Sequence, residues 1–443
     1  MPVVVHSEGV GGTAWRSDVV VTNRNARSQQ LRFTYVSSET GVHSVIRSLP
    51  GFATLFLEDL VATLFEAGDG RGPLEVAVVT SGTVLPVIAS RTYAENSFGN
   101  LGSGLPAGIQ PSSATVSMPG LFQDARFRSN IAVTAGDADV IASFELYRGG
   151  EGRVAGGVQR SIGARAQDQW TINQLFRGFA ADNVPMTVRV SLSRPAIVLA
   201  SLVDNASTDS AVYLGTRAES SWIVPVVARS PGASGTFWSS SVSLWNSSGT
   251  TAWVDLEYLP ELTDNSAGGV YAPSVRLEPG ATVVLDDLLV NWFGIDSGKG
   301  VLAVEATEPI TITSRVFTDG PRGGTSGNGV RAVPASAFGD SDKVLPGVRT
   351  IGGFRTSVGL VTGDDRVSFT IQLRDADGTL LASRAVSVPP RTLRQWSVQQ
   401  LFGSAFEAPN PVGSLVVLPD GDSLAYLTVI DGTSQDPVFV MPQ

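Results

Sequence analysis

The sequence predicts an all-β protein made of four tandem immunoglobulin-like β-sandwich domains, each with one short helix. The first observation is a repeat of about 110 residues, a period that fits a whole domain better than a solenoid coil. The second is the alternation of apolar and polar residues in many short runs, as in strands with one face on a core. The third is composition, because 48 Gly and 25 Pro spread along 443 residues suit many turns between short strands.

Three sequence anchors recur in the same order in every repeat. An aromatic residue precedes an alternating strand, at Trp15, Phe127, Trp238 and Phe354. A helix-like run then ends in phenylalanine, at Phe65, Phe176, Phe293 and Phe402. An apolar strand closes each repeat, at residues 86–93, 196–204, 309–317 and 423–431. Turn-rich segments between the anchors place the domains at 1–110, 111–219, 220–338 and 339–443.

Each repeat offers about seven strand-like runs in a fixed order. They are an opening strand such as PVVVHS, the strand after the anchor aromatic, an alternating strand such as LRFTYV, the approach to a turn, an ATLFL-type strand, and closing strands such as LEVAVV and IASRTY. Seven short antiparallel strands in such a length predict a two-layer sandwich. The chain has no Cys, so the prediction concerns architecture and not the disulfide hallmark of antibody domains.

Two repeats carry a recognisable succession of motifs, LPGFATLFLEDL with SRTY in repeat 1 and LEPGATVVLDDLL with TSRVF in repeat 3. This succession resembles tandem repeats of similar length in secreted proteins of environmental bacteria, which have no assigned function. The resemblance implies a β-sandwich and an extracellular or cell-surface location, and it supplies no catalytic residues. Repeats 2 and 4 depart from it, since they lack the Pro-Gly turn, the acidic pair and the Ser-Arg.

Charge and composition argue against several classes of partner. The net charge of −10 disfavours nucleic acid and anionic membranes, which attract clustered Lys and Arg. No run of 18 apolar residues predicts a membrane span. The opening MPVVVHSEGV has neither the basic nor the apolar region of a signal peptide, so export is an expectation from the resemblance alone.

The adjacent carboxylates Asp286 and Asp287 suggest a catalytic or metal-binding pair. The matching runs of repeats 2 and 4 begin instead with Thr171 and Ser397, which are good helix N-caps. We therefore interpret Asp286 as an N-cap and Asp287 as a first-turn residue that favours the helix dipole.

Other polar candidates have structural readings that are simpler than a catalytic one. His6 and His43 are expected near the N-terminus and in a loop, and no G-x-S-x-G occurs. The run GPRGGTSGNG (320–329) lacks the lysine of a phosphate loop and predicts a flexible hairpin. Three acidic pairs lie in expected loops: Asp137 with Asp139, Asp375 with Asp377, and Asp420 with Asp422. We interpret them as turn-forming residues, and calcium binding is the alternative.

Arg91 and Arg315 stand at equivalent places in the closing strands of repeats 1 and 3. Because an unpaired internal charge is costly, we expect each to have a local carboxylate or a row of carbonyls as its partner rather than a ligand.

The candidate ligand-binding residues lie in repeat 3, which holds five of the eight Trp residues. Strand alternation directs Trp245 and Trp253 outward, the latter with Asp255 and Glu257. Aromatic rings beside carboxylates suit a sugar ring, so these four residues form a predicted carbohydrate platform. The alternative is that a neighbouring domain covers them.

The function that we expect is that of a non-enzymatic extracellular structural or adhesive protein, with no catalytic residues, metal or cofactor. Short linkers predict an extended array, and the terminal strands at 2–7 and 437–442 could pair with a second copy or with a surface polymer. Carbohydrate binding through repeat 3 is the alternative function, and hydrolysis by loop carboxylates is a third and weaker one.

Overall fold

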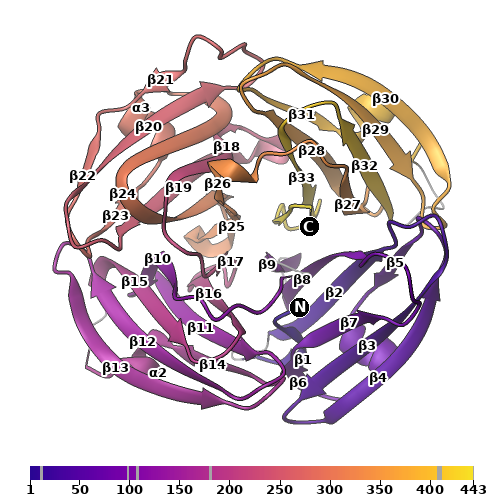
Figure 1. Cartoon of the computed structure of the whole chain (residues 1–443), viewed down its shortest axis with the longest axis horizontal. Coiled ribbons are helices and arrows are strands. Elements are labelled where there is room, and N and C mark those ends of the chain that lie inside the picture. Colours follow the sequence, from indigo (N-terminus) through magenta and orange to yellow (C-terminus); the bar gives the residue numbers. More distant parts are fainter. Residues whose placement is uncertain (10–12, 97–98, 106–108, 179–181, 407–411, 443) are drawn as a thin grey trace. The chain divides into compact units, whose positions relative to one another are not determined.

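The structure is a computed structural model of the chain, and it describes residues 1–9, 13–96, 99–105, 109–178, 182–406 and 412–442. Strands dominate these residues and helices are short, so the predicted all-β class is confirmed (Figure 1). The chain divides into two compact units. Unit 1 comprises Met1–Ile109, Phe338–Pro390 and Arg394–Gln443, and unit 2 comprises Gln110–Ala337 and Arg391–Leu393.

Unit 1 contains repeats 1 and 4. Repeat 1 holds β1 (Val4–Glu8), β2 (Ala14–Thr22), β3 (Gln29–Ser37), β4 (Gly41–Leu49), β5 (Thr54–Leu57), β6 (Gly70–Gly72), β7 (Leu74–Val78), β8 (Val87–Asn96) and β9 (Gly99–Leu105). Repeat 4 holds β27 (Lys343–Val348), β28 (Arg355–Thr362), β29 (Val367–Arg374), β30 (Leu380–Val388), β31 (Leu393–Ser397), β32 (Gly413–Pro419), β33 (Ser423–Ile430) and β34 (Pro437–Val440).

Unit 2 contains repeats 2 and 3. Repeat 2 holds β10 (Val116–Gln123), β11 (Phe127–Ala135), β12 (Val140–Arg148), β13 (Arg153–Ile162), β14 (Gln167–Thr171), β15 (Asp182–Leu192), β16 (Ala196–Asp204) and β17 (Ser210–Leu214). Repeat 3 holds β18 (Glu219–Pro231), β19 (Phe237–Asn246), β20 (Ala252–Pro260), β21 (Val270–Tyr271), β22 (Val275–Leu277), β23 (Thr282–Leu285), β24 (Gly298–Asp319), β25 (Thr325–Val330) and β26 (Val333–Pro334). Its 3₁₀ turns are η1 (Ala233–Gly235), η2 (Pro321–Gly323) and η3 (Ala335–Ala337).

One pattern of strand pairing recurs in all four repeats. In repeat 4 one layer has the order β27-β32-β29-β30 and the other β31-β28-β33-β34, and repeat 2 has the same two orders. Second-with-fifth and third-with-sixth pairings are shared with immunoglobulin domains, whereas the seventh strand here lies beside the second. In repeat 3 the sixth and seventh strands are one continuous strand, β24, which joins both layers into a nine-stranded sheet.

The core of each sandwich follows the alternation in the sequence. In β29, Val367, Phe369, Ile371 and Leu373 are buried and the residues between them are more exposed. The same alternation buries Leu31, Phe33 and Tyr35 in β3. Period-two side chains therefore fill the space between the layers, as predicted.

Each repeat also has an eighth strand, namely β9, β17, β25 and β34, of which only β34 was predicted, as the terminal strand at 437–442. Two of them, β9 and β25, are rich in glycine, which is why their sequences predict loops. The predicted flexible hairpin at 320–329 is thus an ordered hairpin, in which β25 pairs with β24. The eighth strands matter because β9 and β25 supply backbone donors to contacts between repeats.

Each repeat has one short helix: α1 (Leu60–Phe65), α2 (Ile172–Leu175), α3 (Leu288–Phe293) and α4 (Val398–Phe402). Thr171 and Ser397 form the predicted caps, each within a capping box with a glutamine. The predicted acidic caps are wrong. Asp287, not Asp286, occupies the N-cap position of α3, with φ 40° and no side-chain capping bond. Asp59 before α1 has the same left-handed backbone.

The expectation that both terminal strands lie at sheet edges is met by β34 and not by β1. β1 lies inside its sheet, with β6 on one side and β2 on the other. β34 ends its sheet, but Val438 and Val440 are buried in the core cluster of repeat 4. Within the described residues, no helix is long and apolar enough to cross a membrane.

Candidate functional site

The structure does not assemble the predicted carbohydrate platform. Trp245 is 1% exposed, packs edge-on against Tyr147 of repeat 2 at 4.9 Å, and donates from Nε1 to the Gly280 carbonyl. Trp253 is 50% exposed. The two lie on β19 and β20, which belong to different layers of repeat 3, so the prediction that they share one face is wrong. Ligand binding at Trp253 stays a prediction.

The two carboxylates of that predicted site have different environments. Asp255 is exposed and accepts a hydrogen bond from Ser274. Glu257 is buried, and both of its oxygens bind Arg391, with the shorter contact at 2.6 Å. Burial alone would raise the pKa of Glu257, but the hydrogen bonds from Arg391 and the Gly269 N–H outweigh it and lower that pKa. Glu257 therefore serves an internal bridge.

One residue of each acidic loop pair accepts a backbone hydrogen bond, but only that of Asp375 closes its own turn, whereas those of Asp139 and Asp420 reach other segments of the chain. Asp139 accepts from the Ala164 N–H, Asp375 from the Thr379 N–H, and Asp420 from the Ser368 N–H. Among the residues that the structure describes, no three His, Asp or Glu side chains gather as metal ligands.

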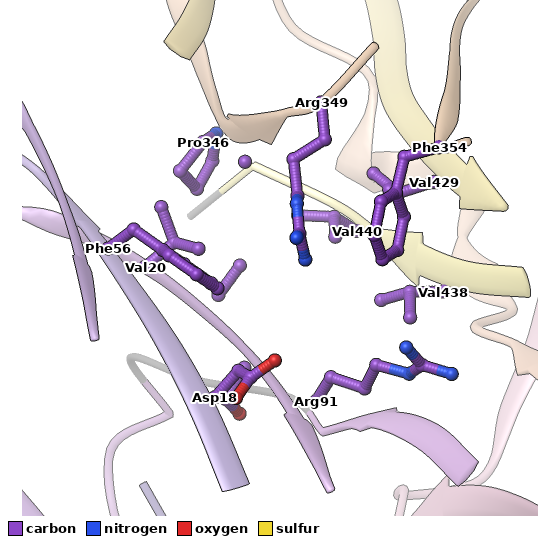
Figure 2. A pocket seen from close by; sticks show the side chains of 13 residues that line it. Asp18, Val20, Phe56, Arg91, Pro346, Arg349, Phe354, Val429, Val438 and Val440 are labelled. Atoms are coloured by element: carbon purple, nitrogen blue, oxygen red, sulfur yellow. The ribbon is translucent and has the colours of Figure 1, made fainter. Parts of the chain in front are cut away.

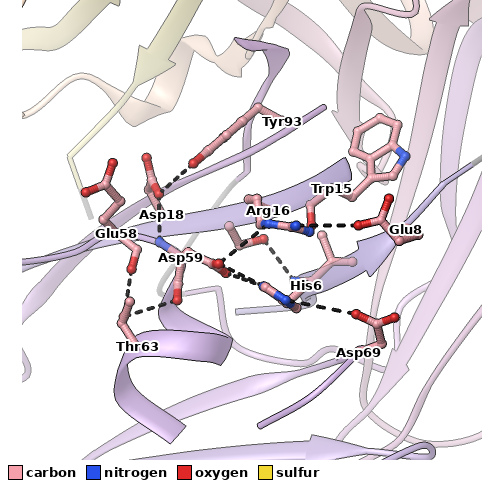
Figure 3. Close-up of polar contacts among 12 residues, drawn as sticks. His6, Glu8, Trp15, Arg16, Asp18, Glu58, Asp59, Thr63, Asp69 and Tyr93 are labelled. Atoms are coloured by element: carbon pink, nitrogen blue, oxygen red, sulfur yellow. Dashed lines mark hydrogen bonds and ion pairs between the residues drawn. The ribbon is translucent and has the colours of Figure 1, made fainter. Parts of the chain in front are cut away.

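The left-handed Asp59 of repeat 1 anchors an ion network, drawn in Figure 3. Its carboxylate lies 2.8 Å from His6 Nδ1 and 3.6 Å from Arg16 Nε. The other ring nitrogen of His6 faces Asp69 at 3.9 Å rather than a nucleophile. In repeat 3, Asp287 pairs with Arg229 at 3.2 Å. Repeats 1 and 3 therefore share a charge pair beside the helix. Both histidines lie on strands, His6 on β1 and His43 on β4.

A buried cluster of charged side chains in unit 1 joins repeat 4 to repeat 1. Arg91, 8% exposed, lies 3.0 Å from Asp436 and 3.5 Å from Asp431, and both carboxylates are buried. Asp436 Oδ2 also accepts the Gly102 N–H at 2.9 Å. We call this contact the 4–1 joint. The sequence predicted a partner for Arg91 correctly, but the partner is a carboxylate pair of another repeat and not a local group.

Unit 2 contains an equivalent contact, which we call the 2–3 joint. Arg315 is 5% exposed, and its guanidinium lies 3.9 Å from Asp209 of repeat 2. Asp209 accepts the Gly327 N–H at 2.6 Å, as Asp436 accepts that of Gly102. Asp204 accepts both the N–H and the hydroxyl of Thr325, which in turn accepts from Arg315.

The acidic face of each joint is a preformed turn. Asp431 Oδ1 accepts the Thr433 and Ser434 N–H groups of its own turn, and Asp204 Oδ1 accepts those of Ala206 and Ser207. One oxygen of the first aspartate therefore shapes the turn, while the other faces the neighbouring repeat.

A cavity of about 50 Å³ lies beside the 4–1 joint (Figure 2). Asp18 and Arg91 line it from repeat 1, and Arg349 enters it from repeat 4 (Figure 2). The Arg349 guanidinium lies 3.7 Å from the ring centroid of Phe354 and 4.8 Å from that of Phe56. Burial raises the pKa of the Asp18 carboxyl and lowers that of Arg349. The cavity beside the joint is thus lined by buried groups of opposite charge.

No protein-family model and no curated protein matches the chain. Among solved structures, a tetra-tandem repeat from the extending region of a large adhesion protein is 13% identical, with 99% of this chain and 97% of that chain covered and a TM-score of 0.12. Dimeric latent PorU from Porphyromonas gingivalis is 8% identical over 81% of this chain and 31% of that one, with a TM-score of 0.15. Likeness this weak does not establish a shared fold.

The acidic halves of the joints were missed in the sequence, although a signal for them was present. An aspartate pair five positions apart follows the closing strand in repeats 2 and 4, and the Ser-Arg motif is found in repeats 1 and 3. Repeats 2 and 4 thus carry an acidic pair and repeats 1 and 3 carry an arginine. Such complementary charges indicate that a repeat with the acidic pair binds a repeat with the arginine.

Proposed function

We propose that this chain is a non-enzymatic structural protein of the cell surface or extracellular space, in which β-sandwich repeats are locked together in pairs. The observation that carries the proposal is the twofold occurrence of one buried Arg–Asp joint, around Arg91 and around Arg315. The extracellular location rests on the sequence resemblance.

The physical cost of these groups supports a structural role. Burying a guanidinium and two carboxylates is unfavourable unless each is paired and hydrogen-bonded. Here they are held by one another and by backbone N–H groups of an eighth strand, Gly102 in β9 or Gly327 in β25. Such an arrangement fixes which faces of two repeats meet.

Single-molecule stretching of the full chain tests this proposal. We expect repeats 2 and 3 to resist force together in the native chain, and Arg315→Met to separate their unfolding into two events at lower force. Arg165→Glu, a change to an exposed arginine outside the joint, is the matched control. Unchanged force traces in Arg315→Met would count against the locking role, and reproducible turnover in a glycosidase, esterase and protease screen would overturn the non-enzymatic part.

Carbohydrate binding is a second candidate, favoured by one exposed surface of repeat 3. Trp253 is 50% exposed and Tyr271 64% exposed, and their strands are joined in one layer, with Tyr271 opposite Glu257 on β20. Exposed aromatic rings near the acceptor Asp255 suit the faces and hydroxyls of a sugar. If this is correct, Trp253→Ala abolishes retention on insoluble polysaccharide while the melting temperature stays unchanged; retention equal to that of the native chain excludes it.

A further inference from the structure

The 4–1 joint links the two repeats that are most distant in the sequence. Arg91 and Asp436 are 345 residues apart, whereas Asp209 and Gly327 of the 2–3 joint are 118 apart. Repeats 1 and 4 would be kept apart by the extended array that the sequence predicts, so their packing in unit 1 is a correction to that prediction.

Each of the two faces of the 4–1 joint is formed within its own repeat. On repeat 4, Asp431 and Asp436 are fixed by the turn between β33 and β34, closed by hydrogen bonds between the backbones of these two aspartates and of Gln435. On repeat 1, Gly102 presents its N–H from β9, which pairs along its whole length with β8, the strand that carries Arg91. Because each face is preorganised, neither requires the other to belong to the same chain.

We propose that the 4–1 joint also forms between two copies of this chain, with repeat 4 of one copy bound to repeat 1 of the other. The inference rests on the proposed joint and adds its partner. The faces differ, one basic and one acidic, so the contact is head-to-tail and a chain that uses both faces in this way can bind two neighbours. Exchange of an identical contact between protomers loses none of its interactions.

Concentration decides between the two forms. A contact within one chain acts at an effective concentration on the order of mM, so the joint stays within the chain in dilute solution. Crowding of copies on a surface, or damage to one face of a chain, favours the joint between copies.

A complementation experiment on the full chain tests the inference. Arg91→Glu breaks the face on repeat 1 and leaves that on repeat 4 intact, and Asp436→Lys does the reverse. Neither variant can form a native joint within itself, but a mixture of the two can form one between chains. We expect each variant alone to sediment at the 46.3 kDa of one chain, and the mixture to give a species of at least twice that mass.

Controls separate this outcome from misfolding. Both variants must keep the strand signal in circular dichroism, and the milder pair Arg91→Gln with Asp436→Asn replaces them if charge reversal prevents folding. A mixture of Asp436→Lys with Arg165→Glu is expected to stay at the mass of one chain. Folded variants whose mixture stays at that mass overturn the inference and leave the stretching test of the 2–3 joint unaffected.

Discussion

The 4–1 and 2–3 joints have equivalent backbone hydrogen bonds but different side-chain contacts. Both use the same turn on the even repeat and the same accepted N–H on the eighth strand of the odd repeat. In the 4–1 joint Arg91 contacts both carboxylates directly, while in the 2–3 joint Thr325 stands between Arg315 and Asp204. Repeats 2 and 3 are consecutive in the chain, whereas repeats 4 and 1 are not. The 4–1 joint, between the non-consecutive repeats, therefore has the more direct charge pairing.

The aromatic contacts around the two joints also differ. Where repeats 2 and 3 meet, Tyr147 packs on Trp245, and where repeats 4 and 1 meet, Arg374 lies 4.3 Å from the ring centroid of Phe52. The comparison shows that the same turn and backbone donor fix how two repeats meet. Aromatic packing is added to a cation–π contact at the 2–3 joint, where Arg315 also lies 5.9 Å from the ring centroid of Phe127.

The largest expected effect comes from removing the direct charge pair. Arg91→Met leaves Asp431 and Asp436 buried without their cation, so we expect a loss of about 3–5 kcal/mol in the free energy of unfolding. Arg315→Met should cost less, about 1–3 kcal/mol, because Thr325 still donates to Asp204 from both its N–H and its hydroxyl, and the 4–1 joint has no such residue. Urea denaturation measures both, and equal losses would remove the distinction between the joints.

The aromatic packing of the 2–3 joint gives the next effect. Trp245→Ala removes a buried ring at the contact with repeat 2 and should cost about 3 kcal/mol or more. Trp253→Ala, on an exposed side chain of the same repeat, should change stability by no more than about 0.5 kcal/mol. Thermal denaturation of the pair decides this, and a Trp253→Ala loss as large as that of Trp245→Ala contradicts it.

A smaller loss of stability is expected from Gly324→Ala, because this glycine lies in close contact with repeat 2. A Cβ at Gly324 would lie 2.5 Å from Asp204 Oδ1 and 2.7 Å from the Ser207 nitrogen. The backbone at Gly324 has φ −84°, so Gly324→Ala perturbs the joint without straining its own residue, at about 1–3 kcal/mol. Gly249→Ala, with open space around it, is the control. Similar melting temperatures for the two variants would show that the joint can shift to accept a methyl group.

The last effect is a pH dependence of the 4–1 joint. Burial raises the pKa of Asp436 from 3.8 to about 7, although Arg91 and the Gly102 N–H act in the opposite direction. A raised carboxyl pKa in the folded state means that its stabilising contribution is complete below its unfolded pKa and is lost as pH rises through about 7. The native chain should therefore lose more stability than Asp436→Asn between about pH 5 and pH 8. Parallel stability curves for the two proteins would refute this assignment.

Sequence patterns predicted the strands well because burial of alternate residues leaves a direct trace in each strand, as in β29. They failed at β9 and β25, where glycine serves close packing between repeats and hides the strand. They also misassigned the acidic pair, because Asp286 was expected to cap the helix and Asp287 to lie in its first turn. Asp287 pairs instead with Arg229, a tertiary contact that no local pattern predicts.

The sequence predicted the arginines of the candidate site but not their carboxylate partners. Arg91 and Arg315 stand out as charges in apolar strands, and a requirement for partners follows from physics alone. Asp204, Asp209, Asp431 and Asp436 lie in turns, where aspartate has an ordinary local explanation. The packing of one repeat on another shows that Asp209, Asp431 and Asp436 lie beside the arginines and that Asp204 is joined to Arg315 through Thr325.

The unbroken strand β24 makes repeat 3 a poor place to insert new sequence. In repeats 1, 2 and 4 a connection separates the sixth and seventh strands, at residues 79–86, 193–195 and 420–422. Insertions at such surface connections are usually tolerated because they lengthen a loop without breaking a ladder. At the same topological position in repeat 3, an insertion would interrupt a strand that pairs with β18, β19 and β20. An affinity tag or a reporter domain therefore belongs at 79–86 and not within Gly298–Asp319.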